Sequence, residues 1–236
     1  MRRIVLFGGA SAVGKTAVLA RLIPRLRERG MAPCVCKIDC AACDDASVLA
    51  AGGVPVVTGV SVDTCPDHYL VSNLVEMRMW AESRGADTLL IETAGLCNRC
   101  SPATWRMLAG CVVDATASCK APAHLGPMLS QADFAVITKV DMVSQAEREI
   151  VCQAIADVNP RAALFPVDGL AGYGIEALVR YVAASSETSD YEDDVLRHTM
   201  PAGVCSYCVG ERRVGAAFQQ GVVDKMDFGE EAACAR

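Results

Sequence analysis

The first chemical signature in the chain is a glycine-rich segment near its N-terminus. Residues 9–16 read Gly-Ala-Ser-Ala-Val-Gly-Lys-Thr and fit the pattern Gly-x-x-x-x-Gly-Lys-Ser/Thr in full. The glycines let backbone N–H groups turn toward phosphates, Lys15 adds a positive charge, and the Thr16 hydroxyl is suited to bind Mg²⁺. A helix that starts here adds the positive field of its N-terminus. The segment predicts a nucleoside-triphosphate site with contacts from Gly9, Ala12, Val13, Gly14, Lys15, Thr16 and Ala17.

A second nucleotide element is expected where a buried strand ends in a carboxylate. Residues 89–92 read Leu-Leu-Ile-Glu, and Glu92 at the end of such a strand is suited to orient Mg²⁺ or its water ligands. The following Thr-Ala-Gly turn ends at Gly95 and is suited to sense the γ-phosphate. An ordinary strand end is the alternative, but the phosphate-binding loop upstream favours the functional interpretation. We therefore expect Lys15 and Glu92 to act in catalysis.

A third element points to the base of the nucleotide. Residues 138–141 read Thr-Lys-Val-Asp, one substitution away from the guanine-reading pattern Asn-Lys-x-Asp. Asp141 can accept hydrogen bonds from N1–H and from the exocyclic amine of guanine, a donor pair that adenine lacks. A hydrogen bond to a charged group contributes roughly 1.5–3 kcal/mol. Thr138, Lys139 and Asp141 therefore predict GTP rather than ATP as the nucleotide.

Cysteine is unusually abundant, with thirteen residues in the chain. The count is odd and the expected fold is intracellular, so metal ligation is favoured over a disulfide framework. Thiolates are soft ligands that suit zinc, copper(I), nickel or iron–sulfur clusters. Two Cys-x-x-Cys pairs, from one chain or from two halves of a dimer, would complete a tetrahedral site or a cluster. The alternative is burial as small hydrophobic side chains. The candidate pairs are Cys40 with Cys43, Cys97 with Cys100, and Cys205 with Cys208.

Short β-rich runs alternate with helical patterns along most of the chain. This alternation predicts βαβ units, and hence an α/β P-loop NTPase fold with a mostly parallel sheet and helices on both faces. The expected strands are 4–7, 33–38, 54–57, 88–91, 111–113, 134–138 and 163–165. The expected helices are 15–29, 46–51, 68–83, 123–130, 145–157 and 175–184.

Composition limits the remaining classes of function. The 236 residues are 52% hydrophobic and carry a net charge of −6, which argues against nucleic-acid binding. No apolar run is long enough to span a bilayer, so we expect a cytoplasmic protein. We predict a GTPase domain at 1–184, a polar acidic linker at 185–196 and a cysteine-containing C-terminal tail at 197–236.

Taken together, these elements resemble the CobW/HypB/UreG family of P-loop metal-maturation GTPases over residues 1–184. Residues 91–96, Ile-Glu-Thr-Ala-Gly-Leu, are similar to the Glu-Thr-Thr-Gly-Leu of the CobW branch. Asp39 and Asp45 fall where UreG and HypB carry an acidic switch segment. Residues 65–68, Cys-Pro-Asp-His, resemble the Cys-Pro-His of UreG with one residue inserted, and 131–142 matches the base-reading segment.

The resemblance implies further roles. Asp39 becomes a candidate for catalysis and for positioning Mg²⁺ or water, beside Thr16 and Glu92. Cys65 and His68 become candidate ligands of a transition metal. Family members insert nickel, cobalt, zinc or similar metals into target enzymes, and they often form homodimers when nucleotide and metal are bound.

The leading hypothesis is a GTP-driven metallochaperone or cofactor-maturation factor whose partner is a client metalloenzyme or its maturation complex. Cys97 and Cys100 follow the γ-phosphate turn and Cys40 and Cys43 follow Asp39, so the nucleotide state is expected to open and close a metal site. An iron–sulfur protein that transfers electrons or matures clusters with nucleotide hydrolysis is the second hypothesis. A metal store or sensor with a degenerate nucleotide site is the third.

Overall fold

A seven-stranded parallel sheet forms the centre of the molecule. The computed structural model describes residues 1–41, 45–62, 64–95, 98–188, 191, 193–199, 210–219 and 224–229. Neighbouring strands all run parallel, in the order β3-β2-β4-β1-β5-β6-β7. The strands are β1 (Arg3–Gly8), β2 (Pro33–Asp39), β3 (Val56–Val60), β4 (Thr88–Glu92), β5 (Leu108–Asp114), β6 (Phe134–Thr138) and β7 (Ala163–Pro166).

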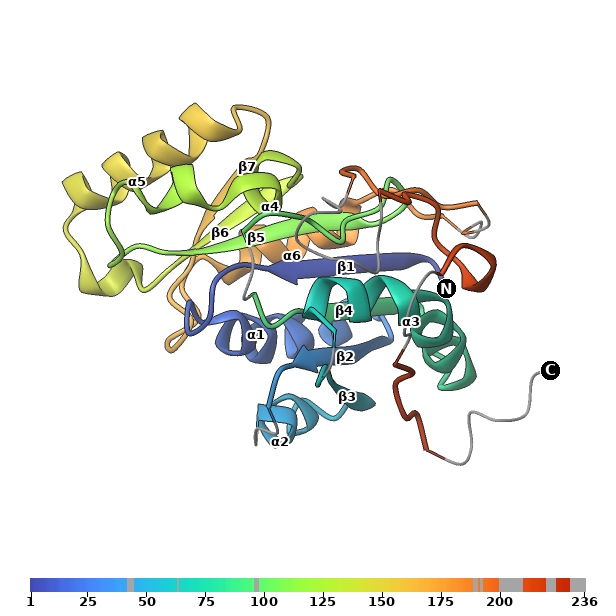
Figure 1. Cartoon of the computed structure of the whole chain (residues 1–236). Coiled ribbons are helices and arrows are strands. Elements are labelled where there is room, and N and C mark those ends of the chain that lie inside the picture. Colours follow the sequence, from blue (N-terminus) through green and yellow to red (C-terminus); the bar gives the residue numbers. More distant parts are fainter. Residues whose placement is uncertain are drawn as a thin grey trace.

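Helices cover both faces of this sheet (Figure 1). On one face, α1 packs against α2 and α6 over a core that includes Phe7 and Phe134. On the other face, α3 covers one half of the sheet and α4 with α5 covers the other half. The α-helices are α1 (Lys15–Glu28), α2 (Asp45–Ala50), α3 (Pro66–Ser83), α4 (Gly126–Ser130), α5 (Gln145–Val158) and α6 (Ile175–Ala184). The predicted fold class is confirmed.

Central strands are apolar throughout because both of their faces are buried. In β6, Phe134 and Val136 pack toward α1 and α6, whereas Ala135 and Ile137 pack toward α4 and α5. The alternation of side chains along a strand produces this division. The parallel direction of the strands places the ends that carry the polar residues at one edge of the sheet.

One predicted helix is wrong in its extent. Residues 123–130 were expected to form one helix, but a 3₁₀ turn (Ala121–His124) precedes the short α4. Gly126 has a φ of 52°, and a Cβ there would stand 2.1 Å from the carbonyl oxygen of Asn98. The left-handed residue and the close backbone contact prevent a continuous helix. The edge strand β3 likewise begins two residues later than expected, at Val56.

The described part of the C-terminal region packs on the domain, and this includes the end of the predicted linker at 185–196. Leu196 is 2% exposed and joins the hydrophobic core, and its neighbour Asp194 is also buried. Arg197 donates to both carboxylate oxygens of Asp133 at 2.8 Å, and to the carbonyl oxygens of Thr104, Met107 and Gln131. The side chain of Arg197 therefore fastens this segment to the sheet. The domain boundaries remain predictions.

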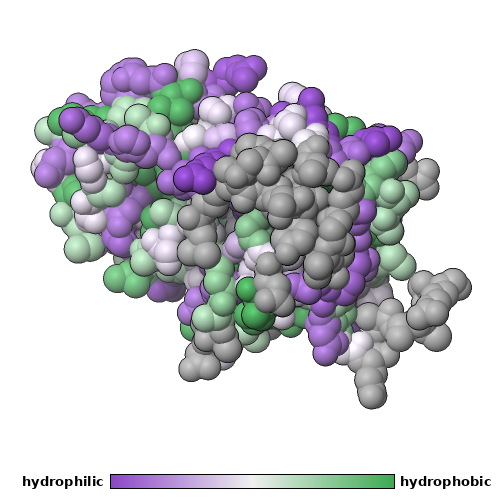
Figure 2. All heavy atoms as spheres, in the orientation of Figure 1, coloured by the Kyte–Doolittle hydropathy of each residue, from purple (hydrophilic) through white to green (hydrophobic). Residues whose placement is uncertain are grey.

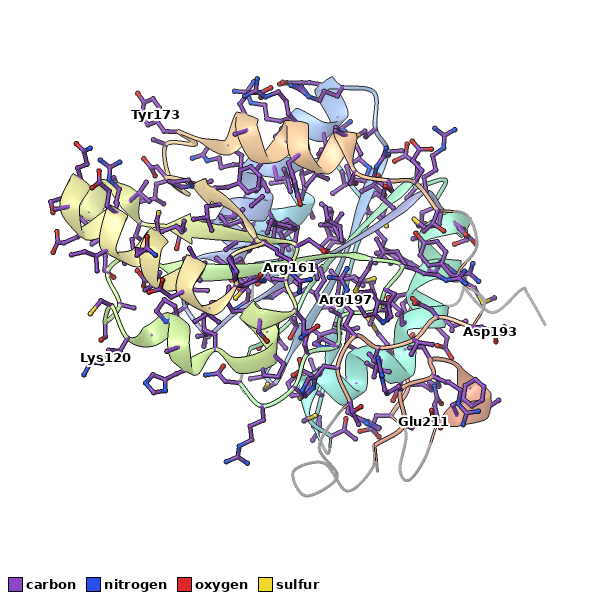
Figure 3. The ribbon with its side chains drawn as sticks, turned by 90° about the horizontal axis from the view of Figure 1, so that it is seen from above. Lys120, Arg161, Tyr173, Asp193, Arg197 and Glu211 are labelled. Carbon is purple, nitrogen blue, oxygen red and sulfur yellow. The ribbon has the colours of Figure 1, made fainter. Side chains whose placement is uncertain are left out.

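Figure 3 shows Arg197 near the middle of the molecule, whereas Asp193 and Glu211 lie toward one side. A second anchor is the buried Asn73 of α3, which donates to the carbonyl of Asp224 and accepts from the N–H of Met226. Met226 also packs in the core beside α3. Residues 224–229 thus bind along α3 rather than extending away from it.

The visible surface mixes hydrophilic and hydrophobic side chains, with hydrophilic ones prominent over α5 (Figure 2). None of the helices in the described part of the chain combines the length and apolar character that a membrane span needs.

Candidate nucleotide and metal site

The loop between β1 and α1 has the backbone that a phosphate-binding loop requires. Gly9 and Gly14 have φ values of 135° and 93°, in a region that side chains disfavour. A Cβ on Gly9 would stand 2.4 Å from the carbonyl oxygen of Val112. A Cβ on Gly95 would stand 1.6 Å from the carbonyl oxygen of Gly9. Gly9 and Gly95 therefore have no room for a side chain, and the turn after β4 lies directly against the phosphate-binding loop.

A cavity of about 310 Å³ lies beside this loop, at the carboxyl edge of the sheet. Its walls include the predicted residues Ala12, Gly14, Lys15, Thr16, Ala17, Asp39 and Glu92. The structure thus brings together the loop, the end of β2 and the end of β4, and the roles of these residues in nucleotide binding stay predictions.

Lys15 is buried and directed onto its own loop. Its ammonium donates to the carbonyl oxygens of Gly9 at 3.1 Å and Ala10 at 2.7 Å. Burial lowers the pKa of Lys15, because desolvation disfavours the charged form. A bound phosphate would restore favourable interactions for that charge.

Thr16 and Glu92 form the next part of the site. The Thr16 hydroxyl donates to Oε1 of Glu92 at 2.8 Å and lies 3.4 Å from Oδ2 of Asp45. The Glu92 side chain is 3% exposed, and its Oε2 is buried with no hydrogen-bond partner among the described residues. A buried carboxylate oxygen without a partner destabilises the fold. Hydroxyl and carboxylate oxygens are the ligands that Mg²⁺ prefers. The residues present therefore fit a magnesium ion.

Lys37 is a residue of this site that the sequence analysis missed. Its ammonium lies 3.0 Å from Oε1 of Glu92, 3.1 Å from Oδ2 of Asp45 and 3.4 Å from Oδ2 of Asp39. Burial acts to lower the pKa of Lys37, but Glu92 and Asp45 outweigh it and raise that pKa above its usual range. A lysine inside the apolar run 33–38 was the available signal, because a charged side chain in a central strand must have buried partners.

The predicted base-reading segment is joined to the phosphate-binding loop. The Thr138 hydroxyl donates to the carbonyl of Val13 at 2.6 Å and lies 3.2 Å from that of Val113. The Lys139 ammonium lies 2.5 Å from a carboxylate oxygen of Asp114 and also donates to the loop. Asp141 follows at the exposed edge, where its carboxylate is accessible.

The Asp114 carboxylate is an additional charged member of this segment. Burial opposes its ionisation, but hydrogen bonds from Lys139 and Thr116 prevail and lower the pKa of Asp114. Lys139 has a φ of 55°, so a left-handed residue turns the chain out of β6 at this point. The turn separates the buried anchor, Thr138, from the exposed Asp141.

The cysteine- and histidine-bearing segments meet on the α3 side of the same edge. Cys65 is the N-cap of α3, and its Sγ accepts from the backbone N–H of His68 at 3.3 Å. Asp67 accepts from the Thr93 hydroxyl at 3.4 Å and from the Cys100 thiol at 3.3 Å. Burial is the main cause that raises the pKa of Asp67, to about 6, and burial lowers that of His68.

The structure brings only some of the predicted metal ligands into view. Cys40 is partly exposed, and burial raises the pKa of its thiol. Cys43, Cys97, Cys205 and Cys208 lie outside the described residues. Within the described part of the chain, no group of three or more His, Cys, Asp or Glu side chains is arranged to hold a metal ion. The transition-metal ligands therefore stay a prediction.

Comparison with known proteins identifies a family model and relatives that this chain resembles. A model of the CobW/HypB/UreG nucleotide-binding domain matches residues 3–166. Protein MJ0120 of Methanocaldococcus jannaschii, itself uncharacterised, is 41% identical over 225 residues, which cover 95% of this chain and 96% of that protein. Urease accessory protein UreG 2 of Streptomyces griseus is 32% identical over 190 residues, covering 74% of this chain and 84% of that protein.

Solved structures with the same fold include two HypB proteins. HypB from Helicobacter pylori, solved in complex with nickel, superposes with a TM-score of 0.63 at 18% identity and covers 79% of this chain and 90% of HypB. The hydrogenase maturation factor HypB from Archaeoglobus fulgidus gives 0.62 at 21% identity, with 77% of this chain and 88% of that one covered.

The parallel sheet, the glycine-rich loop and its cavity define a P-loop nucleotide-binding protein of the α/β class. Within that class, the chain belongs to the CobW/HypB/UreG family. The resemblance seen in the sequence is thereby confirmed.

Proposed function

We propose that this protein hydrolyses GTP and couples the hydrolysis to the delivery of a metal or metallocofactor to a client enzyme in the cytoplasm. One observation carries the coupling: Asp67, between Cys65 and His68, accepts a hydrogen bond from Thr93 in the turn after Glu92. The turn that faces the nucleotide and the segment that carries two candidate metal ligands thus share a buried contact.

The nucleotide part of the proposal assigns a task to each side chain at the carboxyl edge. Lys15 and the amides of its loop hold the phosphates, and Asp141 recognises the guanine edge. Thr16, Glu92 and Asp39 would hold Mg²⁺. When bound with GTP, Mg²⁺ neutralises charge on the β- and γ-phosphate oxygens.

Hydrolysis needs no protein nucleophile. A water molecule attacks the γ-phosphorus in line with the leaving GDP oxygen, so one P–O bond forms as another breaks. Lys15 and the loop amides stabilise the negative charge that develops on the phosphate oxygens. The Gly95 turn, packed against Gly9, is positioned to respond to the loss of the γ-phosphate.

The metal is cargo in this proposal, and nickel, cobalt and zinc are the candidates. Soft thiolate and imidazole ligands such as Cys65, His68 and Cys100 suit these ions better than they suit magnesium. HypB from Helicobacter pylori was solved with nickel, which supports a nickel-type cargo for a family member. We further propose that nucleotide and metal promote a homodimer, as is common in the family.

The test measures metal affinity in two nucleotide states. Wild-type protein is expected to bind Ni²⁺ or Zn²⁺ with affinities that differ at least about fivefold between GDP and a non-hydrolysable GTP analogue. The Asp67→Asn variant should lose most of that difference while keeping its GTP affinity. Asp87→Asn is the matched control, because Asp87 also accepts two hydrogen bonds, from Ala32 and Thr88, but at the opposite edge.

Several results would contradict the proposal. Full GTP hydrolysis by a Lys15→Ala variant would refute the nucleotide site. Equal metal affinity in both nucleotide states of the wild type would refute the coupling. A brown protein with acid-labile sulfide after anaerobic purification would favour the iron–sulfur alternative over a free metal cargo.

A further inference from the structure

Lys37 occupies an unusual place in the sheet. It is a neighbour of Glu92 because β2 and β4 pair in parallel with Lys37 opposite Glu92. The side chain is 4% exposed, although the flanking residues of β2 are apolar. The register of two adjacent strands, rather than a flexible loop, therefore fixes this cation beside the carboxylate.

Three carboxylates share the Lys37 ammonium. They are Glu92 at 3.0 Å, Asp45 at 3.1 Å and Asp39 at 3.4 Å. An ammonium has three N–H donors, so each carboxylate can take one. Lys15, the other lysine of the cavity, hydrogen-bonds instead to the carbonyl oxygens of its own loop. Among the described residues, Lys37 is thus the lysine that pairs directly with the acidic side of the cavity.

These carboxylates are the same groups that a divalent cation would use. Without Lys37, three carboxylates and the Thr16 hydroxyl would line this space, and Lys15, which is bonded to the carbonyl oxygens of its own loop, would remain as the described cation nearby. With Lys37 in place, no three of the described His, Cys, Asp and Glu side chains are arranged to hold a metal ion. Freed of the ammonium, these oxygen ligands would attract divalent ions, and nickel, copper and zinc bind a given site more tightly than lighter metals such as manganese. A fixed ammonium opposes that binding both by its charge and by engaging the ligand oxygens.

We propose that Lys37 is a built-in counter-cation that keeps free divalent metal ions out of the nucleotide site until a nucleotide binds. The negative charge of the arriving triphosphate then shifts the balance in favour of Mg²⁺. One consequence rests on the proposed function: Lys37 thereby shields the magnesium ligands from the cargo metal. The exclusion of free ions does not, because it concerns the nucleotide-free protein alone.

The experiment is a titration of nucleotide-free protein with Mn²⁺, followed by the electron paramagnetic resonance signal of the free ion. Wild-type protein should show no tight stoichiometric site. Lys37→Met should bind one Mn²⁺ at least about tenfold more tightly, which corresponds to about 1.4 kcal/mol. Adding Glu92→Gln to Lys37→Met should remove the gain, since it removes a ligand. Lys37→Gln provides a second neutral variant.

Lys225→Met is the matched control. Lys225 pairs with a single carboxylate, Glu76, on the outside of α3, so its loss leaves no group of carboxylates together. This variant should bind Mn²⁺ as the wild type does. A thermal melt of each variant, with and without Mg²⁺, checks folding and gives a second measure of binding.

Two outcomes would overturn the proposal. One is equal Mn²⁺ affinity of folded Lys37→Met or Lys37→Gln and the wild type. The other is a tight Mn²⁺ site in the wild-type protein without nucleotide, which needs no variant to be observed. Binding of fluorescent GDP to the same samples is measured in parallel. Failure of the wild type to bind GDP would refute the proposed function while leaving the Mn²⁺ result to decide the role of Lys37.

Discussion

Replacing Thr138 by valine should weaken GDP binding by loosening the phosphate-binding loop from β6. The Thr138 side chain is 2% exposed, so no water molecule can take over the hydrogen bond to Val13. Valine keeps the shape of threonine and removes the hydroxyl alone. A buried acceptor left without a donor costs about 1–3 kcal/mol. Since 1.4 kcal/mol is tenfold in affinity, GDP should bind roughly five- to 150-fold more weakly if the whole cost falls on the binding-competent loop.

Titration with a fluorescent GDP derivative measures this effect, and urea unfolding of the same samples measures stability. Thr138→Ser retains the hydroxyl and should stay within about threefold of the wild type, because less than 1 kcal/mol is then at stake. A Thr138→Val protein that binds GDP as tightly as the wild type would refute the reasoning, even if it unfolds at lower urea. It would mean that the bond to Val13 supports the fold but not the nucleotide loop.

The remaining predictions concern the base, the tail and the buried carboxyl. Asp141→Asn should weaken GDP binding at least about tenfold and favour xanthosine diphosphate, whose carbonyl at position 2 matches an amide donor; competition binding measures both. Arg197→Met should lower the free energy of unfolding by about 1–3 kcal/mol in urea, since it removes the charged partner of the partly buried Asp133, which among the described residues keeps only its bond from the Ala109 N–H. The exposed Arg213→Met control should leave the urea midpoint close to that of the wild type. Because burial raises the pKa of Asp67 to about 6, the metal-free folded state holds that proton more tightly than the unfolded chain. Stability should therefore fall between about pH 4 and pH 7, by up to about 3 kcal/mol relative to Asp67→Asn, in urea unfolding across that range.

The nucleotide elements could be predicted from sequence because each carries its own local signal. A glycine-rich loop between a strand and a helix has few other uses, and its spacing identifies Lys15 and Thr16 directly. The Thr-Lys-Val-Asp segment likewise predicted Thr138 and Asp141, and the contact of Asp141 with a guanine base stays a prediction. Thr138 stands at the asparagine position of the pattern Asn-Lys-x-Asp. The sequence did not show its hydrogen bond to Val13, because that bond spans 125 positions and depends on how α1 and β6 approach each other.

The structural features that the sequence did not reveal depend on contacts between segments distant in the chain. The sequence predicted an acidic linker at 185–196, but it did not show that Leu196 joins the core or that Arg197 bonds to Asp133 and to three carbonyl groups. The segment around Leu196 and Arg197 has no regular secondary structure, so no hydrophobic periodicity could predict it. Asp67 interrupted a familiar motif in the sequence, and only the fold shows that Thr93 and Cys100 supply its partners.

The register between β2 and β4 explains why Lys37, which the sequence did not reveal, lies at the candidate site. Placing Glu92 within reach of Thr16 requires β4 to end beside the phosphate-binding loop, and the pairing with β2 then fixes residue 37 next to that carboxylate. An apolar residue at 37 would leave Asp39, Asp45 and Glu92 to repel one another or to capture whichever divalent ion is available. A lysine there balances their charge in the absence of nucleotide. If the proposed function is correct, a protein that delivers transition metals has a physical reason to keep such an oxygen site occupied until GTP arrives.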